Sequence, residues 1–282
     1  MNKSSKILYH LLYPVHLTAW VGIILYYTYF SFSWIDVAYF FIGWTLIYGV
    51  GIHVTMHRYV SHKAFVARRG MKAILLWLAC LNLQGSPLWW AAIHRGSHHR
   101  YTDTDKDAHS PVNGKWYAAH SWLYNWKQHM HIKCVRDLLR DPMHRWIAKQ
   151  YNLIIIVTYL VIGLISWKFL LFGVMLPACI GLYQESNINV MCHSPGIGYR
   201  NIDTLDNSRN VPILAWTSWG QGWHNNHHSM SRSFDFGSTI SGNPKEFDPA
   251  LLLLPFVATK ESRESIFKNR TIAILNHSVS LK

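Results

Sequence analysis

The chain has 282 residues, of which half are apolar and 15% are aromatic, and its formal net charge is +13. A charge of this size suits a nucleic-acid-binding protein, but long apolar runs beside the basic segments indicate a membrane instead, so we expect no nucleic-acid partner. None of the four cysteines forms a CxxC pair, which excludes a zinc or redox motif of that type.

Four apolar runs predict membrane-spanning helices arranged as two hairpins. Each run approaches the roughly 20 residues that a helix needs to cross about 30 Å of hydrocarbon, and the link within each pair is very short. The first run lacks the cleavage pattern of a signal peptide, so we expect it to be retained. We therefore expect one all-α integral membrane domain over residues 1–282. The predicted spans cover residues 8–32, 35–52, 151–167 and 169–191.

The basic residues predict how these spans are oriented. Of the 27 Lys and Arg residues, 15 lie in residues 58–149, nine follow residue 193 and two lie near the N-terminus, whereas Lys168 alone lies in a connection on the other side. Cytoplasmic loops of membrane proteins are enriched in Lys and Arg. We therefore expect both termini to be cytoplasmic, together with a helical cap formed by residues 53–150 and 193–282.

Three dense groups of histidines adjoin the predicted spans on this cytoplasmic side. They read HRYVSH at 57–62, HRGSHH at 94–99 and HNNHH at 224–228. A single histidine on an apolar face is usually a packed core residue, but eight histidines in three such groups are more than a core needs. We therefore predict that the groups converge on a metal centre.

Helical spacing predicts which histidines of the second group share a metal ion. An α-helix places residues i and i+4 on one face, so His94 is expected to pair with His98. His99 lies about a third of a turn further round and is expected to reach a second ion.

The same rule predicts that the third group, His224 with His227 and His228, lies on one helical face. His57 and His62 are five residues apart, which fits a regular helix poorly. We expect that pair to straddle the end of a helix.

The number of imidazoles favours two iron ions. Neutral imidazole suits zinc, copper, iron and nickel, whereas calcium and magnesium prefer oxygen ligands. Eight or nine imidazoles are too many for one tetrahedral zinc ion and match two ions with four or five ligands each. Iron is the ion that activates oxygen at open, nitrogen-rich sites.

The three groups resemble the histidine boxes of integral-membrane fatty acid desaturases, most closely the acyl-CoA delta-9 branch. The resemblance covers about residues 52–237. It also includes YTDTD at 101–105, NxxxH at 189–193, DNSRN at 206–210 and WGQGW at 219–223. It implies an oxygen-dependent desaturase that inserts a cis double bond, of delta-9 type, into a saturated acyl chain carried as a CoA thioester or in a lipid.

The resemblance also implies the composition of the site. Two iron ions (Fe2+/Fe3+) would be the cofactors, with molecular oxygen as co-substrate, and Asn189 would approach one iron through water. A ferredoxin, or a b-type cytochrome with its reductase, would be a separate electron donor, and membrane lipids would surround the spans. The implied catalytic and metal-binding histidines are His57, His62, His94, His98, His99, His193, His224, His227 and His228.

Further residues are candidates for supporting roles. Gln84 lies where the family often has a glutamine lining the substrate channel. Three arginines near the cytoplasmic mouth are candidates for binding an anionic headgroup such as the CoA phosphates; these are Arg58, Arg95 and Arg209. Five carboxylates are candidates to accept a hydrogen bond from a ligand imidazole and fix its tautomer; these are Asp103, Asp105, Asp107, Glu185 and Asp206.

Two departures from the family pattern leave the acyl carrier open. Three residues separate His94 from His98 where the acyl-CoA branch usually has two, and Gln221 replaces the usual glutamate. One alternative function is a di-iron membrane hydroxylase of a lipid or alkane chain, which uses similar boxes. The other is a membrane metal transporter or sensor, which would place ligands along a path inside the spans.

Overall fold

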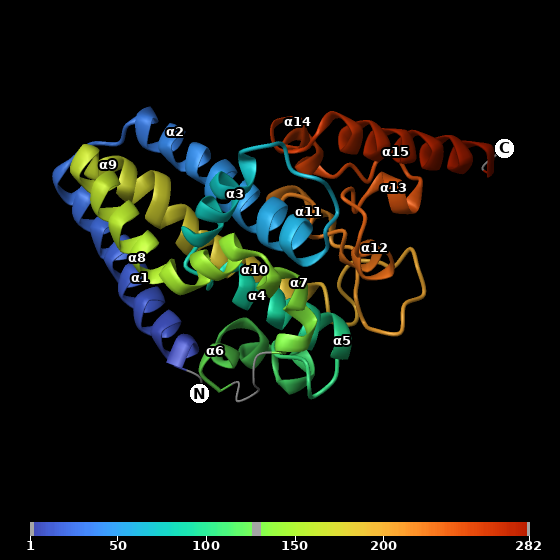
Figure 1. The fold of residues 1–282 in the computed structure, drawn as a ribbon, viewed down its shortest axis with the longest axis horizontal. Helices are drawn as coiled ribbons and strands as arrows, with labels where there is room; N and C mark the ends of the chain where they lie inside the picture. The colour runs from blue at the N-terminus through green and yellow to red at the C-terminus, as the bar shows by residue number, and fades with distance from the viewer. Residues whose placement is uncertain (1–2, 126–130, 281–282) are drawn as a thin grey trace.

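The computed structural model of the chain describes residues 3–125 and 131–280. Within these residues the regular structure is helical, and the β contacts are three isolated bridges. The long helices α1, α2 and α8 lie together on one side of the molecule, and α12, α13 and α15 lie on the other (Figure 1).

The elements of the long-helix side come from two stretches of the chain. They are α1 (Lys3–Tyr29), α2 (Trp34–Gly43), η1 (Trp44–Ser61), α8 (Pro142–Ile165), α9 (Trp167–Phe169), η6 (Leu170–Met175) and α10 (Leu176–Met191). Along the chain, the elements between these two stretches are α3 (Met71–Cys80), α4 (Pro87–Ile93), η2 (His94–His98), α5 (His99–Tyr101), η3 (Pro111–Asn113), η4 (Tyr117–Ser121), α6 (Trp122–Asn125), η5 (Ile132–Val135) and α7 (Arg136–Arg140). The C-terminal part contains α11 (Pro212–Thr217), α12 (His224–Ser229), α13 (Ser238–Ser241), η7 (Pro249–Leu252), α14 (Leu254–Val257) and α15 (Lys260–Ser280).

Three helices in the described residues are long and apolar enough to cross a membrane. They are Trp34–Ser61, Pro142–Ile165 and Trp167–Met191. The outer faces carry exposed large apolar side chains, including Leu164 and Trp34, as expected for a surface in contact with lipid. The run expected at 8–32 corresponds to α1, which packs against η6 and α10.

Local sequence signals explain where these helices begin. Ser33 caps α2 in a capping box with Asp36, and Asp141 caps α8 with Pro142 in the first turn. Ser166 caps α9 directly after α8 ends, which produces the short link expected between these helices. The helix that contains the expected span 35–52 continues to Ser61 and so carries a histidine of the first group.

The extension of this helix is π-helical, with hydrogen bonds from residue i+5 to residue i. Element η1 has this geometry throughout, and the His62 N–H continues it by donating to the His57 carbonyl at 3.1 Å. The side chain of Asn82, which follows α3, donates a hydrogen bond of 2.6 Å to the carbonyl of Ile47 in η1. π-helical turns are rare and frequently mark functional sites.

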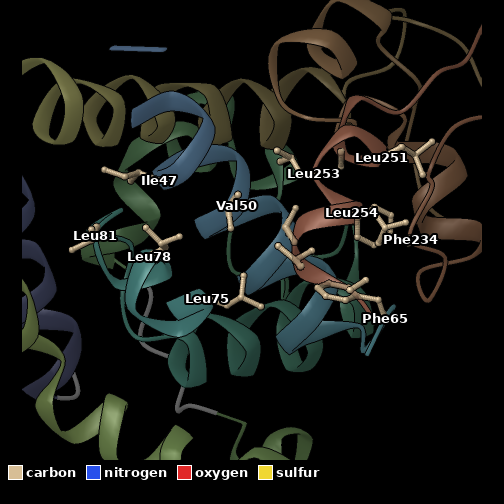
Figure 2. Packing of buried hydrophobic residues seen from close by; sticks show 14 of the residues in the cluster. Ile47, Val50, Phe65, Leu75, Leu78, Leu81, Phe234, Leu251, Leu253 and Leu254 are labelled. Carbon is tan, nitrogen blue, oxygen red and sulfur yellow. The ribbon is translucent and has the colours of Figure 1, made fainter. Parts of the chain in front are cut away.

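A hydrophobic core joins the base of the long helices to the C-terminal part. Val50 from η1, Leu75 and Leu78 from α3, and Leu254 from α14 belong to one buried cluster. Figure 2 shows these side chains together with others of the cluster, among them Phe65 and Phe234, which pack toward one another. The cluster fixes the C-terminal segments against η1, which is the helix that presents the first histidines.

Candidate metal centre

Nine of the histidines converge into two compact groups. The atoms that could bind a metal lie within 4.8 Å of one another in each group. The penta-histidine group consists of His57, His62, His94, His99 and His227, and the tetra-histidine group of His98, His193, His224 and His228. These residues come from η1 and the residue after it, from η2 and α5, from the segment after α10, and from α12.

The pairing expected within the second sequence motif was wrong. His94 joins the same group as His99, whereas His98 belongs to the other group. The reason is the π geometry of η2, in which the His99 N–H donates to the His94 carbonyl five residues earlier. Residues i and i+5 therefore share a face here, and the His94 and His99 Nε2 atoms approach to 3.0 Å.

The third motif also divides between the two groups. His224 and His228 share the tetra-histidine group with Nε2 atoms 3.1 Å apart, as the i, i+4 rule predicts. His227 instead lies with the penta-histidine group, so the expectation that all three share one face was wrong. His57 and His62 do straddle the end of a helix, because η1 ends at Ser61.

Hydrogen-bond acceptors hold the Nδ1 side of every ring in the tetra-histidine group. Three Nδ1 atoms contact carboxylates and the fourth contacts a backbone carbonyl oxygen, and such acceptors require the proton to be on Nδ1. The pairs are His98–Asp107 at 3.1 Å, His193–Asp103 at 3.2 Å, His228–Asp206 at 2.8 Å, and His224 with the Gln221 carbonyl at 3.2 Å.

Three of the five candidate carboxylates thus contact ligand imidazoles as expected. Asp105 does not, because it is exposed between Asp103 and Asp107. Glu185 instead contacts His53, at 3.4 Å, and accepts a hydrogen bond from the Tyr48 hydroxyl.

Bare imidazoles in this arrangement repel one another unless a cation lies between them. The Nε2 atoms of His193 and His224 are 2.9 Å apart, and those of His224 and His228 are 3.1 Å apart. Burial lowers the pKa of His224 well below its usual value and also lowers that of His228, so these rings are neutral near pH 7. Since their protons are on Nδ1, lone pair faces lone pair at Nε2. This donor set fits a metal ion.

In the penta-histidine group, Nε2 atoms of neighbouring imidazoles also face one another at short distance. The Nε2 atom of His99 lies 3.0 Å from that of His94 and 3.1 Å from that of His227. Burial lowers the pKa of His62 to about 3 and that of His94 well below its usual value, and neighbouring basic groups add to both effects. Neutral imidazole is the form that binds a transition metal.

A cavity with about 700 Å³ of empty space, part of it open to solvent, touches both groups. Its lining includes His57 of the penta-histidine group and His224 of the tetra-histidine group. The candidate channel residue Gln84 lines it, and its buried Nε2 has no hydrogen-bond partner. Asn189 also lines this cavity, beside the metal-binding groups.

The arginines expected to meet a substrate headgroup have other partners. Arg58 is fully buried and forms an ion pair with Asp248 at 2.8 Å, so the expectation for this residue was wrong. Arg95 donates to Asp137 at 2.9 Å and to nearby carbonyl oxygens. Arg209 donates to two carbonyl oxygens of the preceding loop. These guanidinium groups therefore link segments of the chain to one another.

A second set of buried polar contacts, centred on His53, was not predicted from the sequence. The side-chain amide of Gln221 contacts Nδ1 of His57 at 2.5 Å and Nδ1 of His53 at 2.8 Å. His53 in turn contacts Glu185, which lines the cavity. The signal available in the sequence was the position of His53 four residues before His57.

These features define an all-helical membrane protein whose histidine-rich site has the donor set for two metal ions. The sequence model of the fatty acid desaturase family matches residues 32–232. The chain belongs to the fatty acid desaturase family, as its histidine motifs predicted.

Individual relatives support the delta-9-like branch. The chain is 33% identical over 213 residues to "Delta-9 acyl-lipid desaturase 2" of Arabidopsis thaliana, a match that covers 73% of this chain and 66% of that protein. It is 31% identical over 210 residues to "sn-1 stearoyl-lipid 9-desaturase" of Anabaena variabilis, a match that covers 73% of this chain and 76% of that protein. It is 31% identical to "Acyl-CoA 5-desaturase AL21" of Anemone leveillei, a match that covers 74% of this chain and 65% of that protein. The chain thus spans about two-thirds of the length of these plant relatives.

Proposed function

We propose that the protein is an oxygen-dependent fatty acyl desaturase that inserts a cis double bond of delta-9 type into a saturated acyl chain. The observation that carries this proposal is the convergence of nine histidines into two groups beside one cavity in a membrane protein. The names of the relatives support an acyl substrate carried either in a lipid or as a CoA thioester.

Two iron ions are the cofactors in this proposal. They would be bound by the five and the four histidines of the two groups, with Asn189 near one of them through water. Bound iron would supply, with molecular oxygen, the oxidising chemistry that an unactivated C–H bond requires, since such a bond has no acidic proton. In the overall reaction the chain loses two hydrogens, and oxygen leaves as two waters after taking up two electrons and two further protons.

The residues of the chain contribute orientation and exclusion of water. Asp103, Asp107 and Asp206 hold three imidazoles with Nδ1 protonated, which leaves Nε2 free to bind a metal. The cavity would hold one segment of the acyl chain next to both groups, and positioning of this kind lowers the barrier to reaction. Gln84 offers a buried amide with an unused donor to the same space.

The proposal includes a topology. Residues 1–282 would form one domain with four spans in two hairpins, α1 being the fourth span beside the three long apolar helices. The distribution of Lys and Arg supports cytoplasmic termini and a cytosolic cap formed by residues 53–150 and 193–282. A separate electron donor, a ferredoxin or a b-type cytochrome with its reductase, would reach the site from the cytoplasm.

Expression in a host that lacks its own delta-9 desaturase tests this function. Lipids and acyl-CoAs are extracted separately, and double bonds are located by mass spectrometry. We expect a new alkene in one pool and its loss in His227→Ala, which should also contain less iron than the unmodified protein. His120→Ala is the matched control, because His120 packs against Trp116 outside both groups and should leave the product unchanged. Alcohols in place of alkenes would contradict the proposal and identify a hydroxylase.

A further inference from the structure

The two histidine groups differ in the charge that surrounds them. Three of the four rings of the tetra-histidine group contact a carboxylate through Nδ1. Across the described residues, no carboxylate makes such a contact with a ring of the penta-histidine group. There His57 faces the neutral amide of Gln221, and the buried Nδ1 of His227 has no partner.

One carboxylate, that of Glu185, is linked to the penta-histidine group, but only through intervening side chains. Glu185 contacts His53 and Tyr48, and His53 contacts Gln221, so two side chains separate Glu185 from His57. A glutamate in place of Gln221 would put a negative charge next to the His57 ring, whereas the amide of Gln221 is neutral.

Basic residues lie close to the penta-histidine group instead. Arg58 follows His57 directly and is paired with Asp248. Arg95 follows His94 and shares the single carboxylate of Asp137 with Lys63. The penta-histidine group therefore has no excess of negative charge around it, whereas three carboxylates contact the rings of the tetra-histidine group.

Negative charge on Nδ1 makes an imidazole a stronger ligand, and loss of such a partner typically costs 10- to 100-fold in metal affinity. We propose that the two metal positions are unequal, with the tetra-histidine position binding metal more tightly and loading first. The penta-histidine position is the weaker and more exchangeable one, and Gln221 is the residue that keeps it so. This inference rests on the proposed two-metal function.

Cobalt(II) titration of the metal-free protein tests the order of loading. The full chain, purified in detergent without a histidine tag and treated with a chelator, is titrated with Co2+ and followed by calorimetry and visible absorption. We expect two Co2+ ions to bind in two resolved steps. Asp206→Asn should weaken the first step by about 10- to 100-fold and leave the second step nearly unchanged.

Gln221→Glu is the reciprocal variant. It introduces a negative charge next to His57, so it should strengthen the second step by about 10-fold and bring the two affinities closer together. Asp105→Asn is the matched control, because Asp105 lies between the two contacting aspartates but is exposed and touches no ring. It should change neither step. Circular dichroism and gel filtration confirm that each variant is folded.

Either of two results would overturn the inference. In the Asp206→Asn variant, the affinity of the first binding step would stay the same or that of the second step would fall. In the Gln221→Glu variant, the affinity of the second binding step would stay the same. A folded chain that binds fewer than two Co2+ ions would contradict the proposed function as well. Binding of two ions with the same two affinities in every variant would contradict this inference alone.

Discussion

Arg58 lies next to a predicted metal ligand in the sequence, but its side chain points away from the site. It donates to Asp248 at 2.8 Å and to three backbone carbonyls, and its guanidinium stacks over Phe236 at 4.1 Å. Neither Arg58 nor Asp248 is exposed. The pair joins η1 to the C-terminal part of the chain, behind the histidines.

Removing one partner of this pair should destabilise the protein severely. Asp248→Ala leaves a buried, unpaired guanidinium, and breaking such a pair costs about 3–5 kcal/mol. Thermal unfolding in detergent measures the loss. Glu264→Ala is the control, because Glu264 pairs with Lys260 in an exposed position on α15 and should cost less than about 1 kcal/mol. Equal effects of the two variants would contradict a structural role for the buried pair.

The sequence could not predict this role of Arg58. Its partner lies 190 residues further along the chain, and nothing local distinguishes a buried arginine from one at a channel mouth. The histidines were predictable because each motif is short and dense, so their chemistry is visible without knowledge of distant contacts. The carboxylate partners Asp103 and Asp107 were predictable for the same reason.

At the scale of elements, the two asparagines of α12 explain how the histidines beside them are fixed. Asn225 accepts from the backbone of residues 201 and 202, and Asn226 accepts from the side chains of Asn201 and Asn210. Asn226 also donates to Glu246 at 2.8 Å. Both asparagines are fully buried. The short helix is therefore oriented by hydrogen bonds, since six residues are too few for a stable isolated helix.

Truncation of Asn226 should loosen this helix. Asn226→Ala leaves several buried polar groups without partners, at about 1–3 kcal/mol for each unsatisfied group. We expect a lower unfolding temperature together with partial loss of bound iron, measured by elemental analysis. Asn269→Ala on the exposed face of α15 should change neither quantity. Full iron content in a destabilised Asn226→Ala protein would show that the network does not orient the ligands.

The pairing of the histidines was beyond the reach of sequence spacing. The i, i+4 rule is correct for His224 and His228, which belong to an α-helix. It fails for His94 because η2 is π-helical, and the choice between α and π turns depends on tertiary contacts that no local pattern reveals. The same geometry makes the five-residue spacing of His57 and His62 favourable, with ring centroids 4.7 Å apart.

For the whole molecule, Asp235 connects several C-terminal segments of the chain and makes the stability of the protein depend on pH. Its carboxylate accepts from the Gly237 and Thr239 backbone and lies 3.5 Å from Arg270 of α15. Burial, and then the charge of Asp248, raise the pKa of Asp235 to about 6. In an unfolded chain this carboxyl has a pKa of about 3.9. The folded state therefore binds the proton more tightly.

The sign of the pH effect follows from this difference. The contribution of Asp235 to stability is fully present below about pH 3.9 and is lost as the pH rises through about 6, by up to about 3 kcal/mol. Asp235→Asn cannot ionise, so its unfolding temperature relative to the unmodified protein should rise between pH 4 and pH 7.5. Hydrogen bonds lost in the variant give an offset that does not depend on pH. A difference that stays constant or falls with pH would contradict the assignment.

The close crossing of two long apolar helices provides the last test. Gly43 of α2 lies so close to η6 that a Cβ atom there would be 1.9 Å from the Gly173 carbonyl oxygen. Small residues at such crossings let backbones approach closely, and packing is the main attraction between helices in lipid. Since α2 continues into η1 and η6 into α10, this contact sets the separation of the helices that present His57 and Asn189.

Gly43→Ala should therefore affect both stability and the site. The methyl group meets backbone, which cannot rotate away, so the helices must separate at a cost of about 1–3 kcal/mol. Gly163→Ala is the matched control on α8, because its methyl group would meet a flexible leucine side chain at 3.1 Å. Thermal unfolding and iron content are measured for both. If Gly43→Ala equals Gly163→Ala in both quantities, the crossing does not position the metal centre.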